Sequence, residues 1–179
     1  MKARKAKKEM QALFEQGFNR EEIFERFIGR DLPEKRVASL VASLKDDTLC
    51  QLYSGRNNFL ISVMFVHSIA AAFIGYIAGS DMEGQAPLWL AGIAALIPLL
   101  FMFGFYKYNL GAYLAFVFLS LTQMPRSFEG FNDAPVVVAS GLLITIGTVV
   151  LVWHVKSKLY PYFGVFGAKQ QGGRFDFSS

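Results

Sequence analysis

Four long apolar stretches dominate this 179-residue chain and limit the folds that are open to it. A helix rises about 1.5 Å per residue, so about 20 apolar residues cross a hydrocarbon core of roughly 30 Å. None of the stretches contains Asp, Glu, Lys or Arg, apart from Lys156 at the end of the fourth. We therefore expect an all-α, polytopic membrane protein with a four-helix transmembrane bundle. The expected spans are residues 58–79, 87–106, 109–124 and 135–156, within a membrane region of residues 57–156.

The third stretch is the shortest, because only 16 residues separate the end of the preceding turn from Pro125. A helix of this length is short for an average bilayer. It would cross upright, borrow residues 106–108 to lengthen itself, or re-enter on the side from which it came. The sequence leaves these alternatives open, and re-entry would change the topology.

Basic residues are unevenly distributed and predict the orientation of the chain. Residues 1–56 hold 12 of the 18 Lys and Arg, whereas the first loop, residues 80–86, holds none. Because basic loops stay in the cytoplasm, we expect a cytoplasmic N-terminus. Four spans also place Lys107 and the basic residues after the fourth span on that side. We thus expect a protein integral to a bacterial inner membrane, with both termini cytoplasmic.

The first 56 residues are predicted to form a cytoplasmic helical domain. Gly17 and Gly29 separate its segments, Asn19 suits a helix N-cap, and residues 55–58 suit a hinge into the first span. Residues 46–53 would add a fourth short helix. Three runs of apolar residues recur at helical spacing: Met10, Leu13 and Phe14; Ile23, Phe24, Phe27 and Ile28; and Val37, Leu40, Val41 and Leu44.

Residues 157–179 form a cytoplasmic tail rich in aromatic residues and glycine. Such a composition suits anchoring at the membrane surface, which we favour, or a small hairpin around Gly172 and Gly173.

His67 is the residue of the spans most suggestive of function, because an ionisable side chain in a membrane is a functional candidate. It begins a stripe in which His67, Ala71, Gly75 and Gly79 recur every four residues. Small residues at this spacing allow helices to pack closely. We interpret the stripe as a helix-packing seam with a neutral histidine, and an intramembrane pH-sensitive or relay site is the alternative. The seam would close within one chain or between copies in a homo-oligomer.

No catalytic, cofactor-binding or metal site is predicted. The chain has no HExxH motif, phosphate-binding loop or dinucleotide-binding glycine pattern. Carboxylates of the two outward loops, Asp81 and Glu83 with Glu129 and Asp133, would form a metal cluster only if the loops met, and solvated loop charges are the simpler interpretation. Residues 9–56 carry 7 basic and 9 acidic groups, so we expect no nucleic-acid partner.

These observations favour a non-enzymatic, membrane-anchored adaptor or oligomeric scaffold whose N-terminal domain binds a protein partner. The alternative is a small channel or transporter that uses His67, and a third hypothesis is an enzyme that modifies lipids. The arrangement of the polar side chains in the spans separates the first two. In a channel or transporter these side chains would line one lumen, whereas in an adaptor they would lie in separate helix-packing seams. They are His67, Ser68, Tyr113, Thr145 and Thr148.

Overall fold

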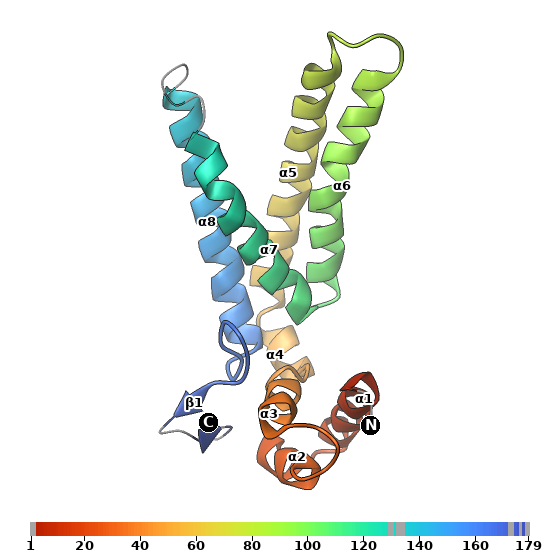
Figure 1. Cartoon of the computed structure of the whole chain (residues 1–179), viewed down its shortest axis with the longest axis vertical. Coiled ribbons are helices and arrows are strands. Elements are labelled where there is room, and N and C mark those ends of the chain that lie inside the picture. Colours follow the sequence, from red (N-terminus) through yellow and green to blue (C-terminus); the bar gives the residue numbers. More distant parts are fainter. Residues whose placement is uncertain (1–2, 129–130, 132–134, 172–173, 176, 178–179) are drawn as a thin grey trace. The chain divides into compact units, whose positions relative to one another are not determined.

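The computed structural model describes residues 3–128, 131, 135–171, 174–175 and 177 (Figure 1). Within these residues the protein is helical, with eight α-helices, one 3₁₀ helix and two short strands. The chain divides into two compact units. The terminal unit consists of Met1–Gln51 and Lys156–Ser179, and the membrane unit consists of Leu52–Val155.

Local sequence signals set the limits of the helices in the terminal unit. Gly17 and Gly29 adopt positive φ angles of 97° and 76° between helices, a conformation that glycine tolerates best. Asn19 caps the second helix, because its side chain accepts from the Glu22 amide at 2.8 Å while Glu22 accepts from the Asn19 amide at 3.0 Å. The predicted cap is confirmed. The helices are α1 (Ala3–Glu15), α2 (Arg20–Phe27), α3 (Glu34–Ala42) and α4 (Asp47–Leu52).

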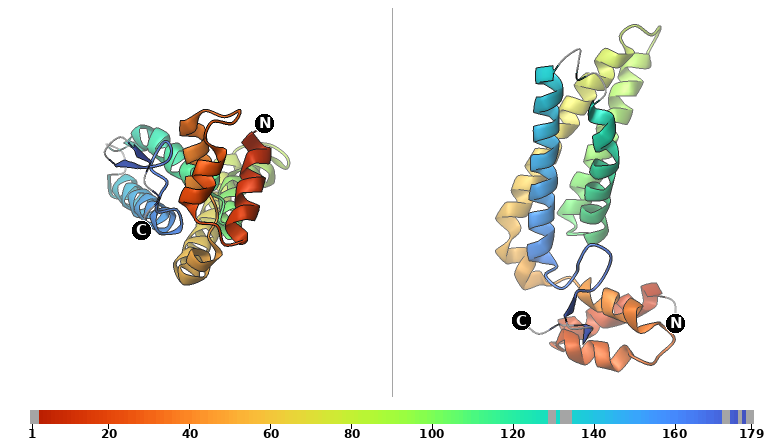
Figure 2. Two further views of the ribbon diagram at one scale, coloured as in Figure 1. Left: turned by 90° about the horizontal axis from the view of Figure 1, so that it is seen from below. Right: turned by 60° about the vertical axis from the view of Figure 1, so that its left-hand side comes forward.

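The apolar faces of α1, α2 and α3 pack together into a core. Figure 2 shows these three helices, red to orange, lying close to one another. Met10, Ile23 and Val37 are fully buried, each from a different helix. The helical spacing of apolar residues therefore reflects burial within this unit. Partly buried side chains that surround the core include Leu13, Phe14, Phe18, Phe24, Leu32, Leu40 and Phe177.

The tail belongs to the same compact unit as the N-terminal helices. Strands β1 (Gln170–Gln171) and β2 (Arg174–Phe175) pair antiparallel, as in the hairpin that was the alternative to anchoring at the membrane surface, and the turn expected at 172–173 lies outside the described residues. The Phe24 ring lies 5.7 Å from the Phe175 ring and 5.3 Å from the Phe177 ring. These aromatic residues of the tail thus pack on α2.

Three helices of the chain are long and apolar enough to cross a membrane. They are α5 (Ser54–Gly79), α6 (Ala86–Tyr106) and α8 (Pro135–Leu159), and they match the first, second and fourth predicted spans. Helix α7 (Leu110–Gln123) is also apolar, but it has only 14 residues and continues into the 3₁₀ helix η1 (Met124–Phe128). Three of the four expected spans are therefore helices long enough to cross a membrane, and the third, which was expected to be the shortest, is a short apolar helix.

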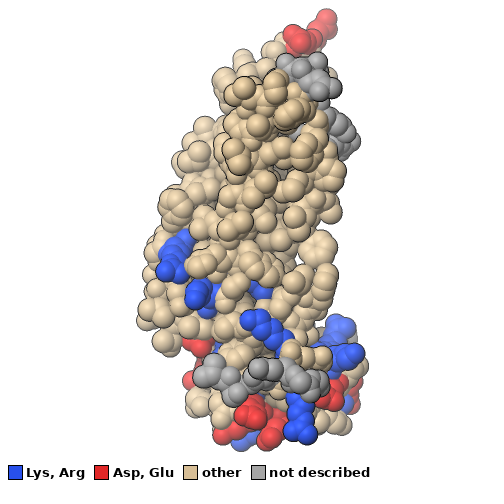
Figure 3. All heavy atoms as spheres, turned by 90° about the vertical axis from the view of Figure 1, so that its left-hand side faces the viewer, with Lys and Arg blue, Asp and Glu red and all other residues tan. Residues whose placement is uncertain are grey.

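Helices α5 and α6 lie side by side and antiparallel in both views (Figures 1 and 2). Large apolar side chains point outward from the long helices: Phe73 is 66% exposed, Trp89 69% and Val136 80%. Figure 3 shows the result as a broad surface without charged side chains. Such a surface suits contact with lipid, because exposing apolar side chains to water is unfavourable.

The predicted hinge at residues 55–58 is wrong, because α5 begins at Ser54 and runs through these positions as regular helix. Helices α4 and α5 are instead separated at Tyr53, before the predicted hinge. The reason lies in Asn57, whose side chain is fully buried and donates to the Phe105 carbonyl at 3.1 Å. This contact holds the first turn of α5 against the end of α6.

Candidate functional site

The stripe on α5 lies against α6 of the same chain. A Cβ atom added at Gly75 would come within 2.6 Å of the Leu90 carbonyl oxygen, and one added at Gly79 would come within 2.7 Å of the Pro87 Cα. The two backbones are therefore close enough that only glycine fits at these positions. The two glycines pack inside one chain, so self-association would need another surface.

His67 begins the stripe and is half-buried. Its Nδ1 lies 2.8 Å from the Val63 carbonyl oxygen, one turn earlier in α5. A carbonyl only accepts, so Nδ1 carries the proton. In the neutral ring, Nε2 then offers a lone pair that the helix does not use.

His67 lines a partly open cavity of about 230 Å³ whose walls come from α5, α6 and α7. Ser120 and Gln123 of α7 are its other polar side chains. That these two residues line the same cavity as His67 could not be predicted from local patterns, because more than 50 positions separate them from His67 along the chain. The apolar lining comes from all three helices: Met64, Ala94, Ile97, Pro98, Phe101, Phe116 and Leu119.

The other polar residues singled out in the spans do not line this cavity. Ser68 donates across the seam to the Ala95 carbonyl at 3.3 Å. Thr145 and Thr148 donate to carbonyls one turn earlier in α8, at 2.9 Å and 2.8 Å. These three hydroxyls donate to backbone carbonyls, as is common in membrane helices.

Tyr113 belongs to a separate buried cluster where α5, α6 and α7 meet. Its hydroxyl donates to Asn57 Oδ1 at 2.5 Å, and its ring stacks on Phe105 with centroids 4.7 Å apart. All three side chains are fully buried. Sequence reasoning missed this cluster, because Asn57 stands just before the first span and looked like part of a hinge.

His154 of α8 contacts Arg56 of α5, with 2.8 Å between Arg56 Nη1 and His154 Nε2. A guanidinium only donates, so His154 accepts through Nε2 and is neutral in this contact. Protonation of the imidazole would remove the acceptor and set two positive charges against each other.

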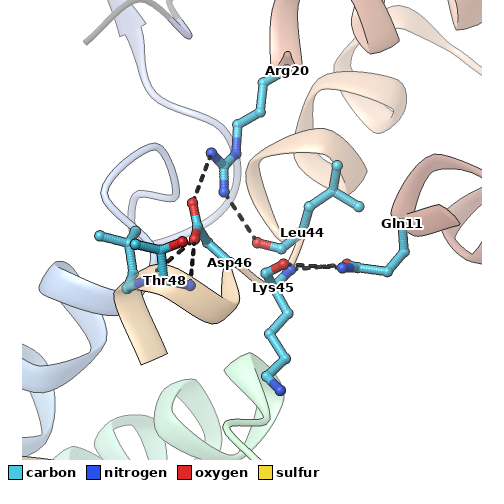
Figure 4. Close-up of polar contacts among 7 residues, drawn as sticks. Gln11, Arg20, Leu44, Lys45, Asp46 and Thr48 are labelled. Carbon is cyan, nitrogen blue, oxygen red and sulfur yellow. Dashed lines mark hydrogen bonds and ion pairs between the residues drawn. The ribbon is translucent and has the colours of Figure 1, made fainter. Parts of the chain in front are cut away.

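A second candidate site lies in the terminal unit, around the connector formed by residues 44–46 between α3 and α4. Gln11 of α1 holds the backbone of Lys45 with two hydrogen bonds, each 3.0 Å long. Arg20 of α2 donates to the Leu44 carbonyl at 3.4 Å and pairs with the Asp46 carboxylate at 3.8 Å (Figure 4). Asp46 also accepts from the first amides of α4, at Thr48 and Leu49.

The Arg20 guanidinium is almost completely buried, with 9% of the side chain exposed. It lies between two rings, 4.5 Å from the Phe14 centroid and 5.0 Å from the Tyr162 centroid. Burial lowers the pKa of Arg20, and the negative charge of Asp46 opposes that shift. Arg20 thus joins α2, the connector and the tail at one point.

Next to the connector is a hollow of about 440 Å³. Phe14 and Phe18 supply apolar surface, while Asp46 and Asp47 supply negative charge and Lys45 supplies one positive charge. Lys45 and Asp47 pair at 2.9 Å, in an exposed ion pair. The remaining lining residues are Glu15, Gly17, Asn19 and Thr48.

The loop carboxylates are not brought together as a site in the part of the chain that the structure describes. Asp81 and Glu83 are exposed, and Glu129 and Asp133 lie outside the described residues. Among the residues that the structure describes, no group of three or more His, Cys, Asp or Glu side chains is placed to hold a metal ion.

Comparison of the chain with protein-family models, with curated proteins and with solved structures finds no match. Any functional assignment therefore depends on the geometry described above.

Proposed function

We propose that this protein is a non-enzymatic, membrane-anchored adaptor whose terminal unit binds a protein partner on the cytoplasmic side. The observation that carries the proposal is the terminal unit itself. It has a buried core from three helices, and the aromatic tail packs on that core through Phe24. A folded unit of this kind, held at the membrane by long apolar helices, suits a docking platform.

The contacts between the two chain ends support a four-crossing topology. Phe24 near the N-terminus packs on Phe175 and Phe177 near the C-terminus, so both ends lie on one side of the bilayer. A chain whose ends share a side crosses an even number of times. The three long helices alone would give an odd number, so we assign the remaining crossing to α7 together with η1.

The length of this fourth segment is compatible with a crossing. The 14 residues of α7 span about 21 Å. The 5 residues of η1 add about 10 Å at the steeper rise of a 3₁₀ helix. Together they approach the roughly 30 Å of a hydrocarbon core. The excess of Lys and Arg in residues 1–56 then supports a cytoplasmic terminal unit.

The hollow beside the connector is the surface that we assign to the partner. It combines the apolar Phe14 and Phe18 with the exposed carboxylates of Glu15 and Asp47, a mixture that suits a peptide segment carrying an apolar side chain next to Lys or Arg. Its rim is built on a connector that Gln11 and Arg20 hold in place. A preformed rim reduces the ordering cost of binding.

Site-specific photo-crosslinking in native membranes tests the proposal. A photoreactive phenylalanine analogue at Thr48, an exposed residue on the hollow, should yield a discrete crosslinked protein. The same analogue at Arg36, which is exposed on α3 and does not line the hollow, is the matched control. The change Asp47→Lys, at an exposed carboxylate that leaves the contacts of Asp46 with Arg20 and α4 in place, should reduce the product strongly. Crosslinks of equal yield at Arg36, or none at Thr48, would count against an adaptor.

Conduction through His67 is tested independently by ion flux into liposomes. The hydroxyls of Ser68, Thr145 and Thr148 bond to backbone carbonyls, which gives conduction less support than the terminal unit gives an adaptor. A proton or monovalent-ion flux that disappears in His67→Ala would replace the adaptor proposal with a channel or transporter.

A further inference from the structure

The cavity beside His67 combines an apolar wall with hydrogen-bond acceptors. Phe101 and Phe116 meet edge to face within it, with ring centroids 5.2 Å apart. Pro98 and Met64 complete an apolar lining on two helices. Asp, Glu, Lys and Arg are absent from the residues that line it. Its occupant should therefore be uncharged and largely apolar.

The cavity offers acceptors at His67 and at Ala94, beside the mixed donor and acceptor groups of Ser120 and Gln123. Because His67 Nδ1 donates to Val63, Nε2 of the neutral ring can only accept. Pro98 has no N–H, so the Ala94 carbonyl loses its regular donor four residues on, and both residues line the cavity. A ligand that donates a hydrogen bond would satisfy these groups, and the Ser120 hydroxyl can donate or accept beside them.

We propose that this cavity binds a membrane-soluble molecule with an aromatic ring and a hydroxyl group, such as a phenol or a hydroquinone, whose hydroxyl donates to Nε2 of His67. A volume of about 230 Å³ accommodates one or two rings. The rings of Phe101 and Phe116 offer edges and faces to an aromatic guest. Ile97 and Leu119, which are 50% and 38% exposed, border the lipid side, where a longer apolar substituent would extend.

The size of the cavity and the character of its lining argue against a metal or alkali cation as occupant. Such an ion needs several oxygen ligands at short range, and carboxylates are missing from the lining. The inference is independent of the adaptor proposal, because the cavity lies entirely in the membrane unit and the hollow entirely in the terminal unit.

Fluorine NMR on purified full-length protein in lipid nanodiscs tests the inference with two matched probes. One is a fluorinated hydroxybiphenyl, and the other is its methyl ether, which cannot donate a hydrogen bond. Empty nanodiscs measure partitioning into lipid. We expect saturable binding of the hydroxyl probe above this background, and binding about tenfold weaker for the ether.

Three variants show whether His67 is the acceptor. His67→Leu should weaken the hydroxyl probe about tenfold, while leaving the ether unchanged. His67→Gln restores an acceptor oxygen and should recover part of the affinity, which a general loss of folding would not allow. His154→Gln alters the other histidine and should bind like the wild type. Equal binding of the two probes, or equal binding of the hydroxyl probe to wild type and His67→Leu, would overturn the inference.

Discussion

Tyr113 and Asn57 form a buried polar contact in the membrane unit. The Tyr113 hydroxyl donates to Asn57 at 2.5 Å where three helices converge, and neither side chain reaches the surface. Tyr113→Phe keeps the stacked ring but leaves the Asn57 amide oxygen without this donor. We expect a loss of about 1–3 kcal/mol in stability, measured as a lower midpoint of thermal unfolding in detergent.

Tyr76→Phe is the control for Tyr113, because Tyr76 is 49% exposed on α5. Removal of the Tyr76 hydroxyl should leave the midpoint of thermal unfolding within error of that of the wild type. A midpoint for Tyr113→Phe as high as that for Tyr76→Phe would show that the buried hydrogen bond contributes nothing to stability.

Cys50 in α4 should be a slow nucleophile. Burial raises the pKa of its thiol from a usual 9.0 to about 11, with the negative charges of Asp47 and Asp46 acting in the same direction and Lys45 opposing them. Because the thiolate is the reactive form, its fraction at pH 8 falls about a hundredfold, and the alkylation rate should keep rising about tenfold per pH unit up to pH 10, whereas that of an ordinary thiol levels off near pH 9.

The rate of alkylation by iodoacetamide, followed by mass spectrometry between pH 7 and pH 10, measures this shift. Thr48→Cys in a Cys50→Ser background provides an exposed thiol on the same helix for comparison. Equal rates for the two thiols across this range would contradict a raised pKa.

The close packing of α5 against α6 can be tested by adding a methyl group at the seam. Gly75→Ala would place a methyl group 2.6 Å from a backbone oxygen of α6 that cannot rotate away. The helices would have to separate, at a cost of about 1–3 kcal/mol. Gly92→Ala is the matched control on α6, because an added Cβ there meets nothing within 4 Å.

Unfolding of both variants in mixed micelles with increasing dodecyl sulfate, monitored by circular dichroism, compares them. We expect an earlier transition for Gly75→Ala and an unchanged or later one for Gly92→Ala, since alanine favours helix. The seam would be looser than described if Gly75→Ala unfolded no earlier than the wild type.

Helix limits that depend only on neighbouring residues could be predicted from the sequence. The Asn19 cap with Glu22 and the turn glycines Gly17 and Gly29 depend only on near neighbours. Residues 55–58 looked like a hinge because the partner of Asn57 is a carbonyl 48 positions away. The meeting of His67 with Ser120 and Gln123 was hidden for the same reason, since it depends on how α7 packs against α5 and α6.

The tail shows that composition leaves more than one packing partner open for aromatic residues. Its aromatic residues are as suited to a lipid interface as to a protein core, so composition alone favoured the membrane surface. Phe24 offers Phe175 and Phe177 a protein surface instead, while Phe166 remains 87% exposed. Cysteine labelling in whole cells can test the topology that follows from this contact.

That topology predicts which sites an impermeant maleimide reaches in intact cells with a permeabilised outer membrane. In a Cys50→Ser background, exposed Glu83→Cys in the first loop should label, because it faces outward. Glu25→Cys and Gln170→Cys, both exposed in the terminal unit, should label only after the inner membrane is disrupted. Labelling of Gln170→Cys but not Glu25→Cys in intact cells would mean an odd number of crossings. Such a result would also contradict the contact between the tail and Phe24, and it would remove the support for α7 with η1 as the fourth crossing.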